Sequence, residues 1–222
     1  MSTVNIAIDG PAGAGKSTIA KLAAEKLGFI YVDTGAMYRA MALKCIRNGV
    51  ASSEEDKVSD ICSGCDIDIK YENGEQNVLL DGENVNSLIR TEEVSQMTSA
   101  ISVYQKVREK LLLLQRNVAK NNNVIMDGRD IGSNVLKDAD VKIYLTASVQ
   151  TRAKRRYAEQ KEKGMDVSLA DIEKDIEERD YRDMHREIAP LVVAENATII
   201  DSSDMTIEQV TDKIVNLANN VK

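Results

Sequence analysis

Histidine and cysteine are scarce in this sequence, which limits the metal sites that it can form. Its 222 residues include one histidine, His185, and three cysteines, Cys45, Cys62 and Cys65. A tetrahedral zinc site needs four ligands, and the Cys62-x-x-Cys65 pair has no second cysteine pair to complete it. We interpret the pair as structural or incidental, with a metal or redox role as the alternative. An odd number of cysteines without a signal peptide favours reduced thiols in a cytosolic compartment.

Long apolar runs and an excess of basic residues are also absent. No run approaches the roughly 20 apolar residues of a membrane-spanning helix. The 29 basic residues are mixed among 36 acidic ones, giving a formal net charge of -7, so we expect neither a nucleic-acid nor a membrane partner. The first residues already belong to a predicted strand, so we expect no targeting segment and a cytoplasmic location. The length fits one α/β domain with an inserted subdomain.

A phosphate-binding loop follows the first apolar run. The pattern Gly10-x-x-x-x-Gly15-Lys16-Ser17 lies between a short predicted strand and a predicted helix, which is the context that a P-loop requires. Its glycines let the backbone amides approach a phosphate, Lys16 reaches the β- and γ-phosphates, and the Ser17 hydroxyl can bind Mg²⁺. The alternative is a glycine-rich turn without a ligand. The predicted ATP-binding residues are Gly10, Pro11, Ala12, Gly13, Ala14, Gly15, Lys16, Ser17 and Thr18.

Strands alternate with helices along most of the chain. The predicted strands are 6–8, 29–32, 124–126, 141–145 and 198–200. Helices are predicted at 18–27, where Gly28 ends the helix, and at 36–48. The capping-box patterns Ser52-x-x-Glu55 and Thr206-x-x-Gln209 predict two further helix starts. This alternation predicts an α/β fold with a doubly wound, five-stranded parallel sheet.

A small antiparallel insertion interrupts the alternation. Residues 66–71 alternate with period two, Asn73-Gly74 is a strong hairpin signal, and Asp81-Gly82 marks a second turn. We therefore predict an antiparallel β meander within residues 61–90. Residues 91–120 are predicted to be helical, with a break near 103–105.

Polar and charged side chains follow the carboxyl ends of two predicted strands. Tyr38 and Arg39 come shortly after one, and Asp127, Arg129 and Asp130 follow another. Ligands of doubly wound sheets bind at the carboxyl ends of the strands, and buried charges there need partners. These residues are therefore candidates for a substrate site. The alternative for Tyr38 and Arg39 is a solvated helix surface.

Two charged helices between the last two strands have the pattern of a mobile lid. Ser148 is predicted to cap the first, residues 164–168 break it, and Ser168-x-x-Asp171 starts the second, which extends to about residue 187. The first helix contains Arg152, Lys154, Arg155 and Arg156. The second holds Arg179, Asp183 and Arg186 on one face. The alternative is a solvated charged face, which we prefer for residues 161–163.

The absence of two sets of motifs argues against two classes of nucleotide-binding protein. A GTPase-like switch generally has Asp-x-x-Gly and Asn-Lys-x-Asp, and a protein kinase has His-Arg-Asp in its catalytic loop; the sequence contains none of these. Arginines distributed around a P-loop fit phosphoryl transfer, in which catalysis consists of positioning and charge neutralisation.

Four ordered motifs, at residues 8–17, 33–39, 127–132 and 178–191, resemble the bacterial cytidylate kinases. The resemblance covers essentially the whole chain, including the meander. It implies transfer of the ATP γ-phosphate to CMP or dCMP with Mg²⁺, by a mainly monomeric cytosolic enzyme. It also implies a core (1–35, 121–150, 189–222), a monophosphate-binding subdomain (36–120) and a lid (151–188). The alternative is a nucleoside monophosphate kinase that acts on another base.

The resemblance also assigns roles to individual residues. Catalytic roles fall on Lys16, Arg39, Asp127, Arg129, Arg155 and Arg156, with Ser17 at the metal. CMP-binding positions are Thr34, Tyr38, Arg39, Ser99, Arg108, Asp127, Arg129, Asp130, Arg179, Asp183 and Arg186. Within this set, Arg179 and Asp183 match a ribose-binding pair. The family pattern allows serine at position 34 and threonine at position 133, and both exchanges keep a hydroxyl.

Hydrogen-bond chemistry independently favours cytosine. Cytosine presents an amino donor and two acceptors, so Asp130 can accept from the amino group while Arg108 donates to the acceptors. Uracil would place like groups against each other, and such a site discriminates by roughly 10⁴ or more. No general base is required because the acceptor phosphate is already anionic, and we interpret Asp127 as an organiser of metal or water.

Overall fold

A parallel sheet forms the centre of the molecule. The computed structural model describes residues 3–72 and 74–221. Within these residues the sheet has five strands in the order β2-β6-β1-β7-β8, and every pair is parallel. Its strands are β1 (Asn5–Asp9), β2 (Ile30–Asp33), β6 (Val124–Gly128), β7 (Val141–Thr146) and β8 (Thr198–Asp201). The predicted doubly wound sheet is confirmed, with β1 at its centre.

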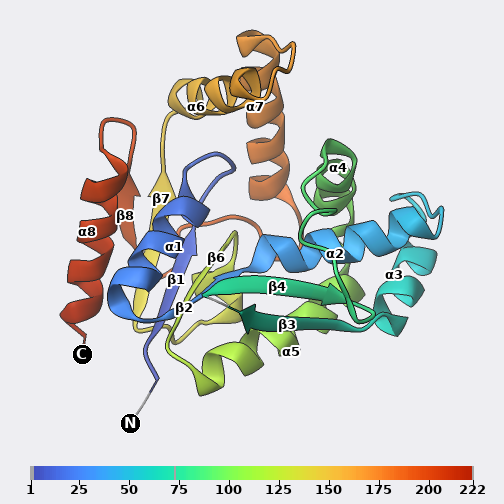
Figure 1. The fold of residues 1–222 in the computed structure, drawn as a ribbon, viewed down its shortest axis with the longest axis horizontal. Helices are drawn as coiled ribbons and strands as arrows, with labels where there is room; N and C mark the ends of the chain where they lie inside the picture. Colours follow the sequence, from blue (N-terminus) through green and yellow to red (C-terminus); the bar gives the residue numbers. More distant parts are fainter. Residues whose placement is uncertain (1–2, 73, 222) are drawn as a thin grey trace.

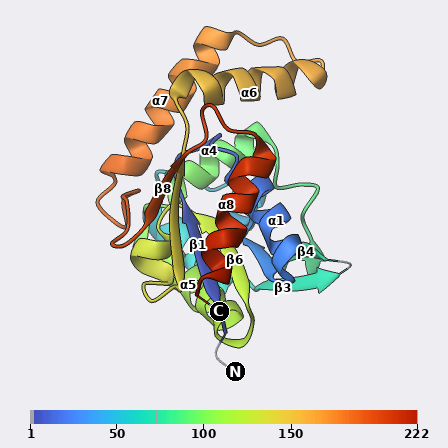
Figure 2. The same ribbon diagram turned by 90° about the vertical axis from the view of Figure 1, so that its left-hand side faces the viewer.

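Helices cover both faces of the sheet because its strands are apolar on both sides. Ile6 and Ile8 of β1 pack in one apolar cluster with α1 (Lys16–Leu27) and α8 (Ile207–Asn219). Ala7 points to the other face and packs in a second cluster, which includes side chains of α2 (Thr34–Arg47) and α5 (Gln105–Asn121). Figure 2 shows α1 and α8 together on one side of the sheet. None of the helices in residues 3–72 and 74–221 is long and apolar enough to cross a membrane.

The insertion forms a second, antiparallel sheet beside β2. Strands β3 (Ile67–Glu72), β4 (Glu75–Leu80) and β5 (Glu83–Asn84) form it, between α3 (Glu55–Gly64) and α4 (Glu92–Ile101). The predicted meander and the break before α5 are confirmed. In the predicted Asn73-Gly74 turn, Gly74 has a φ of 79°, whereas Asn73 lies outside the described residues.

Two features of the sequence analysis lie in this region, a capping box and the three cysteines. The Ser52 capping box is wrong: Glu54 occupies the N-cap of α3, and its carboxylate instead accepts a hydrogen bond from the Ala51 N–H at 3.0 Å. Cys45, Cys62 and Cys65 are buried free thiols in the apolar cluster. Within the described ranges, no group of three potential ligands is placed to hold a metal.

Two helices stand over the carboxyl end of the sheet. Ser148 caps α6 (Val149–Glu162) and Ser168 caps α7 (Leu169–His185), as predicted. Figure 1 shows both helices projecting beyond the sheet, above the loop that precedes α1. Their facing sides form a separate apolar cluster of Ala153, Ile172 and Ile176. This pair of helices therefore has its own small core.

Candidate active site

The P-loop fits tightly between β1 and α1. Gly10 has a φ of 151°, and a Cβ there would lie 1.9 Å from the Leu145 carbonyl oxygen, so no larger residue is compatible with this path. Gly15 takes the left-handed conformation, with a φ of 85°, and is the N-cap of α1. The helix therefore starts at Lys16 rather than at Thr18. Lys16, Ser17 and Thr18 lie in its first turn, where the helix dipole favours an anion.

Lys16 is buried at the centre of the loop. Its Nζ donates to the Pro11 carbonyl at 2.8 Å. Burial, followed by the nearby Arg129 charge, lowers the pKa of Lys16 to about 7. A bound phosphate would favour the ammonium form. The site therefore holds a lysine whose charge depends on its ligand.

Oxygen atoms gather beside Lys16 at the end of β6. The Ser17 hydroxyl donates to Asp127 Oδ2 at 2.9 Å, and the Tyr31 hydroxyl donates to Asp127 Oδ1 at 3.0 Å. Burial, followed by repulsion from Asp33, raises the pKa of Asp127 to about 6. A cation would relieve this repulsion, and hydroxyl and carboxylate oxygens are the ligands that Mg²⁺ prefers. The residues present therefore fit a magnesium ion.

A cleft of about 980 Å³ extends from the P-loop to α4 and α5. Eleven basic and six acidic side chains line it among the described residues, so this acidic protein concentrates positive charge at one place. The predicted site residues that line it are Ala12, Gly13, Gly15, Lys16, Ser17, Thr18, Thr34, Tyr38, Arg39, Ser99, Arg108, Asp127, Arg129, Asp130, Arg155, Arg156, Arg179, Asp183 and Arg186. The predicted residues Gly10, Pro11 and Ala14 belong to the same loop but are not among the described residues that line the cleft.

A buried ion pair lies at the end of the cleft near α4 and α5. Arg108 Nη2 donates to Asp130 Oδ2, and Arg186 Nη2 donates to Asp130 Oδ1 at 3.3 Å. The Arg108 guanidinium also lies 5.8 Å from the centre of the Tyr38 ring. Ser99 lines the cleft nearby. Donors and an acceptor thus lie side by side, which is the arrangement that hydrogen-bond recognition of a base requires.

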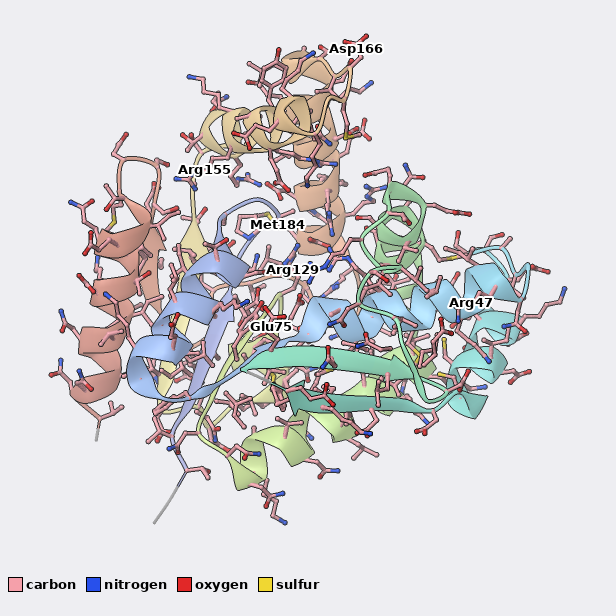
Figure 3. The ribbon with its side chains drawn as sticks, in the orientation of Figure 1. Arg47, Glu75, Arg129, Arg155, Asp166 and Met184 are labelled. Carbon is pink, nitrogen blue, oxygen red and sulfur yellow. The ribbon has the colours of Figure 1, made fainter. Side chains whose placement is uncertain are left out.

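Arginines occupy the middle of the cleft. Arg129 Nε donates to Asp183 Oδ2 at 2.8 Å, and Figure 3 shows Arg129 near the centre of the molecule, below α7. Arg179 Nε is buried and has no hydrogen-bond partner within the described residues. Burial, followed by repulsion from Arg129, lowers the pKa of Arg179 to about 10. A buried donor without a partner beside like charges favours an anionic ligand at this point.

The two predicted lid arginines occupy different places. Arg155 Nη2 donates to the Ser202 carbonyl at 2.7 Å, in the loop after β8, and Figure 3 shows Arg155 on the underside of α6. Arg156 lies 3.5 Å from the exposed Glu92 carboxylate at the start of α4. Both side chains line the cleft, but in this structure each contacts a residue at the edge of the cleft.

Several residues that shape the site received no role from the sequence. Arg152 Nη1 donates to the Ala12 carbonyl at 2.9 Å and so supports the P-loop from α6. The Gln76 amide makes two hydrogen bonds, of 2.9 and 3.1 Å, with the backbone of Asp33, and Arg90 Nη2 donates to the Asp33 carboxylate at 2.8 Å. The position of Asp33 at a strand end is the one signal that marks this cluster in the sequence.

Comparisons with known proteins agree with this geometry. The Cytidylate kinase family model matches residues 6–220. The Cytidylate kinase of Caldicellulosiruptor saccharolyticus is 53% identical over 98% of this chain and 96% of its own length, and that of Lactobacillus johnsonii is 50% identical over 96% and 93%. Shikimate kinase from Bacteroides thetaiotaomicron covers 97% of this chain and 98% of its own, with 16% identity and a TM-score of 0.50, and supports the fold alone. The chain therefore belongs to the cytidylate kinase family.

Proposed function

We propose that this enzyme transfers the γ-phosphate of ATP to CMP or dCMP, giving ADP and CDP or dCDP. The observation that carries the proposal is one continuous cleft with the P-loop lysine at one end and the Arg108–Asp130 pair at the other. Family membership supports the same reaction. A nucleoside monophosphate kinase for another base would use the same P-loop, so the Arg108–Asp130 pair is what distinguishes the two.

The arginines between the two ends support the chemical step. The transferred phosphoryl group spreads negative charge over its equatorial oxygens, and catalysis consists largely of neutralising that charge. Lys16 binds the donor phosphates, whereas Arg39 and Arg129 orient the acceptor phosphate and stabilise the developing charge. Because Arg129 is already held by Asp183, its guanidinium needs little reorganisation on binding.

Mg²⁺ is the proposed cofactor, with Ser17 as its protein ligand and Asp127 holding the surrounding water. When bound, the ion would neutralise part of the negative charge of the phosphates. The Ser17–Asp127 contact of 2.9 Å supports this assignment. Asp127 takes no proton in the reaction, since the acceptor phosphate is already anionic.

The base assignment follows from the buried pair. Asp130 accepts from the cytosine amino group and Arg108 donates to the ring acceptors; uracil would leave buried groups unsatisfied, which is costly. Arg179 and Asp183 are proposed to bind the sugar. We propose both CMP and dCMP as substrates.

We further propose that α6 and α7 act as a lid and that residues 36–120 act as the acceptor subdomain. The separate apolar cluster of the lid supports movement as a unit. Closure would exclude water that otherwise hydrolyses the donor. A monomeric state and a cytoplasmic location are proposed from the resemblance of the motifs.

A coupled ADP-release assay tests the function directly. The purified protein is given ATP and Mg²⁺ with CMP, dCMP, UMP, AMP, dTMP and GMP in turn. Selective turnover of CMP and dCMP is the expected result. Preference for another monophosphate would transfer the assignment to a related kinase, and ATP binding without turnover of any acceptor would contradict an enzymatic role.

A further inference from the structure

Asp9 is a buried carboxylate that the proposed chemistry does not use. It is the last residue of β1, directly before Gly10, and it is 2% exposed. Its Oδ1 accepts the Ile131 N–H and its Oδ2 accepts the Gly132 N–H, both at 2.7 Å. Each oxygen therefore accepts a hydrogen bond from a backbone amide.

The amides that Asp9 holds belong to the loop that carries the acceptor-binding residues. Ile131 and Gly132 follow Arg129 and Asp130 immediately and begin the π-helical turn η1 (Ile131–Val135). The first N–H groups of a helical turn have no partner inside it, so an external acceptor fixes where the turn begins. Asp9 supplies that acceptor from the strand that leads into the P-loop.

Charge stabilisation does not explain this placement. Burial disfavours the charged form of Asp9, and the Asp130 carboxylate adds a smaller repulsion, so the pKa of Asp9 is raised to about 6 despite its two amide hydrogen bonds. A neutral asparagine would avoid that cost, but it has one acceptor oxygen and would turn its amino group toward the second N–H. The carboxylate therefore serves geometry, because only it accepts from both amides.

We propose that Asp9 is a positioning residue that sets the Arg129–Asp130 loop relative to the P-loop and so determines acceptor affinity and base selectivity. This inference rests on the proposed transfer to CMP. It gives Asp9 a role beyond the P-loop that it precedes, because loss of its two hydrogen bonds would displace mainly the Arg129–Asp130 loop on the acceptor side of the cleft.

Steady-state kinetics of Asp9→Asn test the inference, with Asp140→Asn as the matched control. Asp140 Oδ2 also accepts a backbone N–H of β1, that of Asn5 at 2.7 Å, but at the far end of the strand. For Asp9→Asn we expect the CMP KM to rise and the CMP-to-UMP ratio of kcat/KM to fall, each by about tenfold or more, with a clearly smaller rise in the ATP KM, because the Asp9 charge also supports the Lys16 ammonium. The control should change none of these values by more than about twofold. Equal changes in the CMP and ATP constants, or no change, would overturn the inference.

A double-mutant cycle tests whether Asp9 acts through Asp130. The CMP-to-UMP ratio of Asp9→Asn combined with Asp130→Asn should be no lower than that of Asp130→Asn alone. Additive losses would overturn the inference.

Failure of the inference can be distinguished from failure of the proposed function. If the wild-type enzyme does not phosphorylate CMP, both are rejected. If the wild-type enzyme is active and the Asp9→Asn variant is unaffected, the inference alone is rejected.

Hydrogen exchange gives a test that does not depend on a folded variant. In the wild-type protein without nucleotide, the amides of Ile131 and Gly132 should exchange as slowly as those of β1, and CMP should add little protection. Fast exchange that becomes slow only when CMP binds would show that the loop is not held in advance, and would overturn the inference.

Discussion

Binding of ATP should take up a proton at Lys16. The pKa of Lys16 is about 7 in the nucleotide-free protein because the ammonium is buried and close to Arg129. Contact with anionic phosphates raises this pKa, so the bound lysine is charged. The ATP affinity is therefore at its plateau below the free-enzyme pKa and falls as the pH rises through 7. From pH 6 to pH 8 the protonated fraction of the free enzyme falls from roughly nine-tenths to one-tenth, which weakens ATP binding about tenfold.

Calorimetry in buffers of different ionisation enthalpy measures this uptake. We expect about 0.5 proton per ATP at pH 7 and about 0.9 at pH 8, where the terminal phosphate of ATP is already ionised. The matched variant is Lys16→Arg, whose guanidinium stays charged throughout this range and should take up no proton at pH 8. Uptake near zero in the wild type, or equal uptake in both proteins, would refute the reasoning.

Three further predictions concern other parts of the cleft. Replacement of Asp127 by Asn should lower kcat by two or more orders of magnitude. It should also stabilise the protein relative to wild type as the pH rises from 4 to 7, because the wild-type carboxyl must ionise in a buried site with a pKa of about 6. Thermal unfolding of the nucleotide-free proteins at several pH values measures this Tm difference, and a difference that does not depend on pH would contradict the prediction. Arg129→Ala should raise the CMP KM and lower kcat, since it removes a phosphate-binding group and leaves Asp183 without this partner; an effect confined to the ATP KM would place Arg129 elsewhere. Gln76→Ala removes two hydrogen bonds to Asp33 and should cost about 1–3 kcal/mol in urea unfolding while raising the CMP KM; unchanged stability and kinetics would show that this contact is dispensable.

Local sequence signals predicted the parts of the fold whose physics is local. The P-loop glycines, the Thr206–Gln209 capping box and the Ser148 cap depend on backbone conformation and on groups within three residues of each other, and all occur where predicted. The Ser52 capping box failed because Glu54 competes for the same helix start. Choosing between two adjacent capping residues depends on packing, which a pattern does not contain.

Contacts distant in sequence explain what was missed. Arg152 and Ala12 are separated by 140 positions, and Asp9 and Ile131 by 122. Their residue types alone suggest a solvated arginine and an ordinary strand end, since nothing nearby marks a partner. The motifs shared with the cytidylate kinases identified the residues that are expected to face the substrates. The residues that support them from behind belong to no such motif. The roles of the substrate-facing residues remain predictions, to be decided by kinetics.

The central place of β1 determines when the sheet can be completed during synthesis. Asn5 pairs with Val124, and β2 joins the sheet only through β6, so the first two strands made by the ribosome have no strand neighbours until β6 emerges. At 5–20 residues per second, the roughly 120 residues from β1 to β6 take about 6 to 24 s to translate. During that interval the apolar strand Asn5–Asp9 stays exposed to misfolding and to chaperones. The phosphate-binding loop is thus among the first segments translated and among the last to gain its final shape.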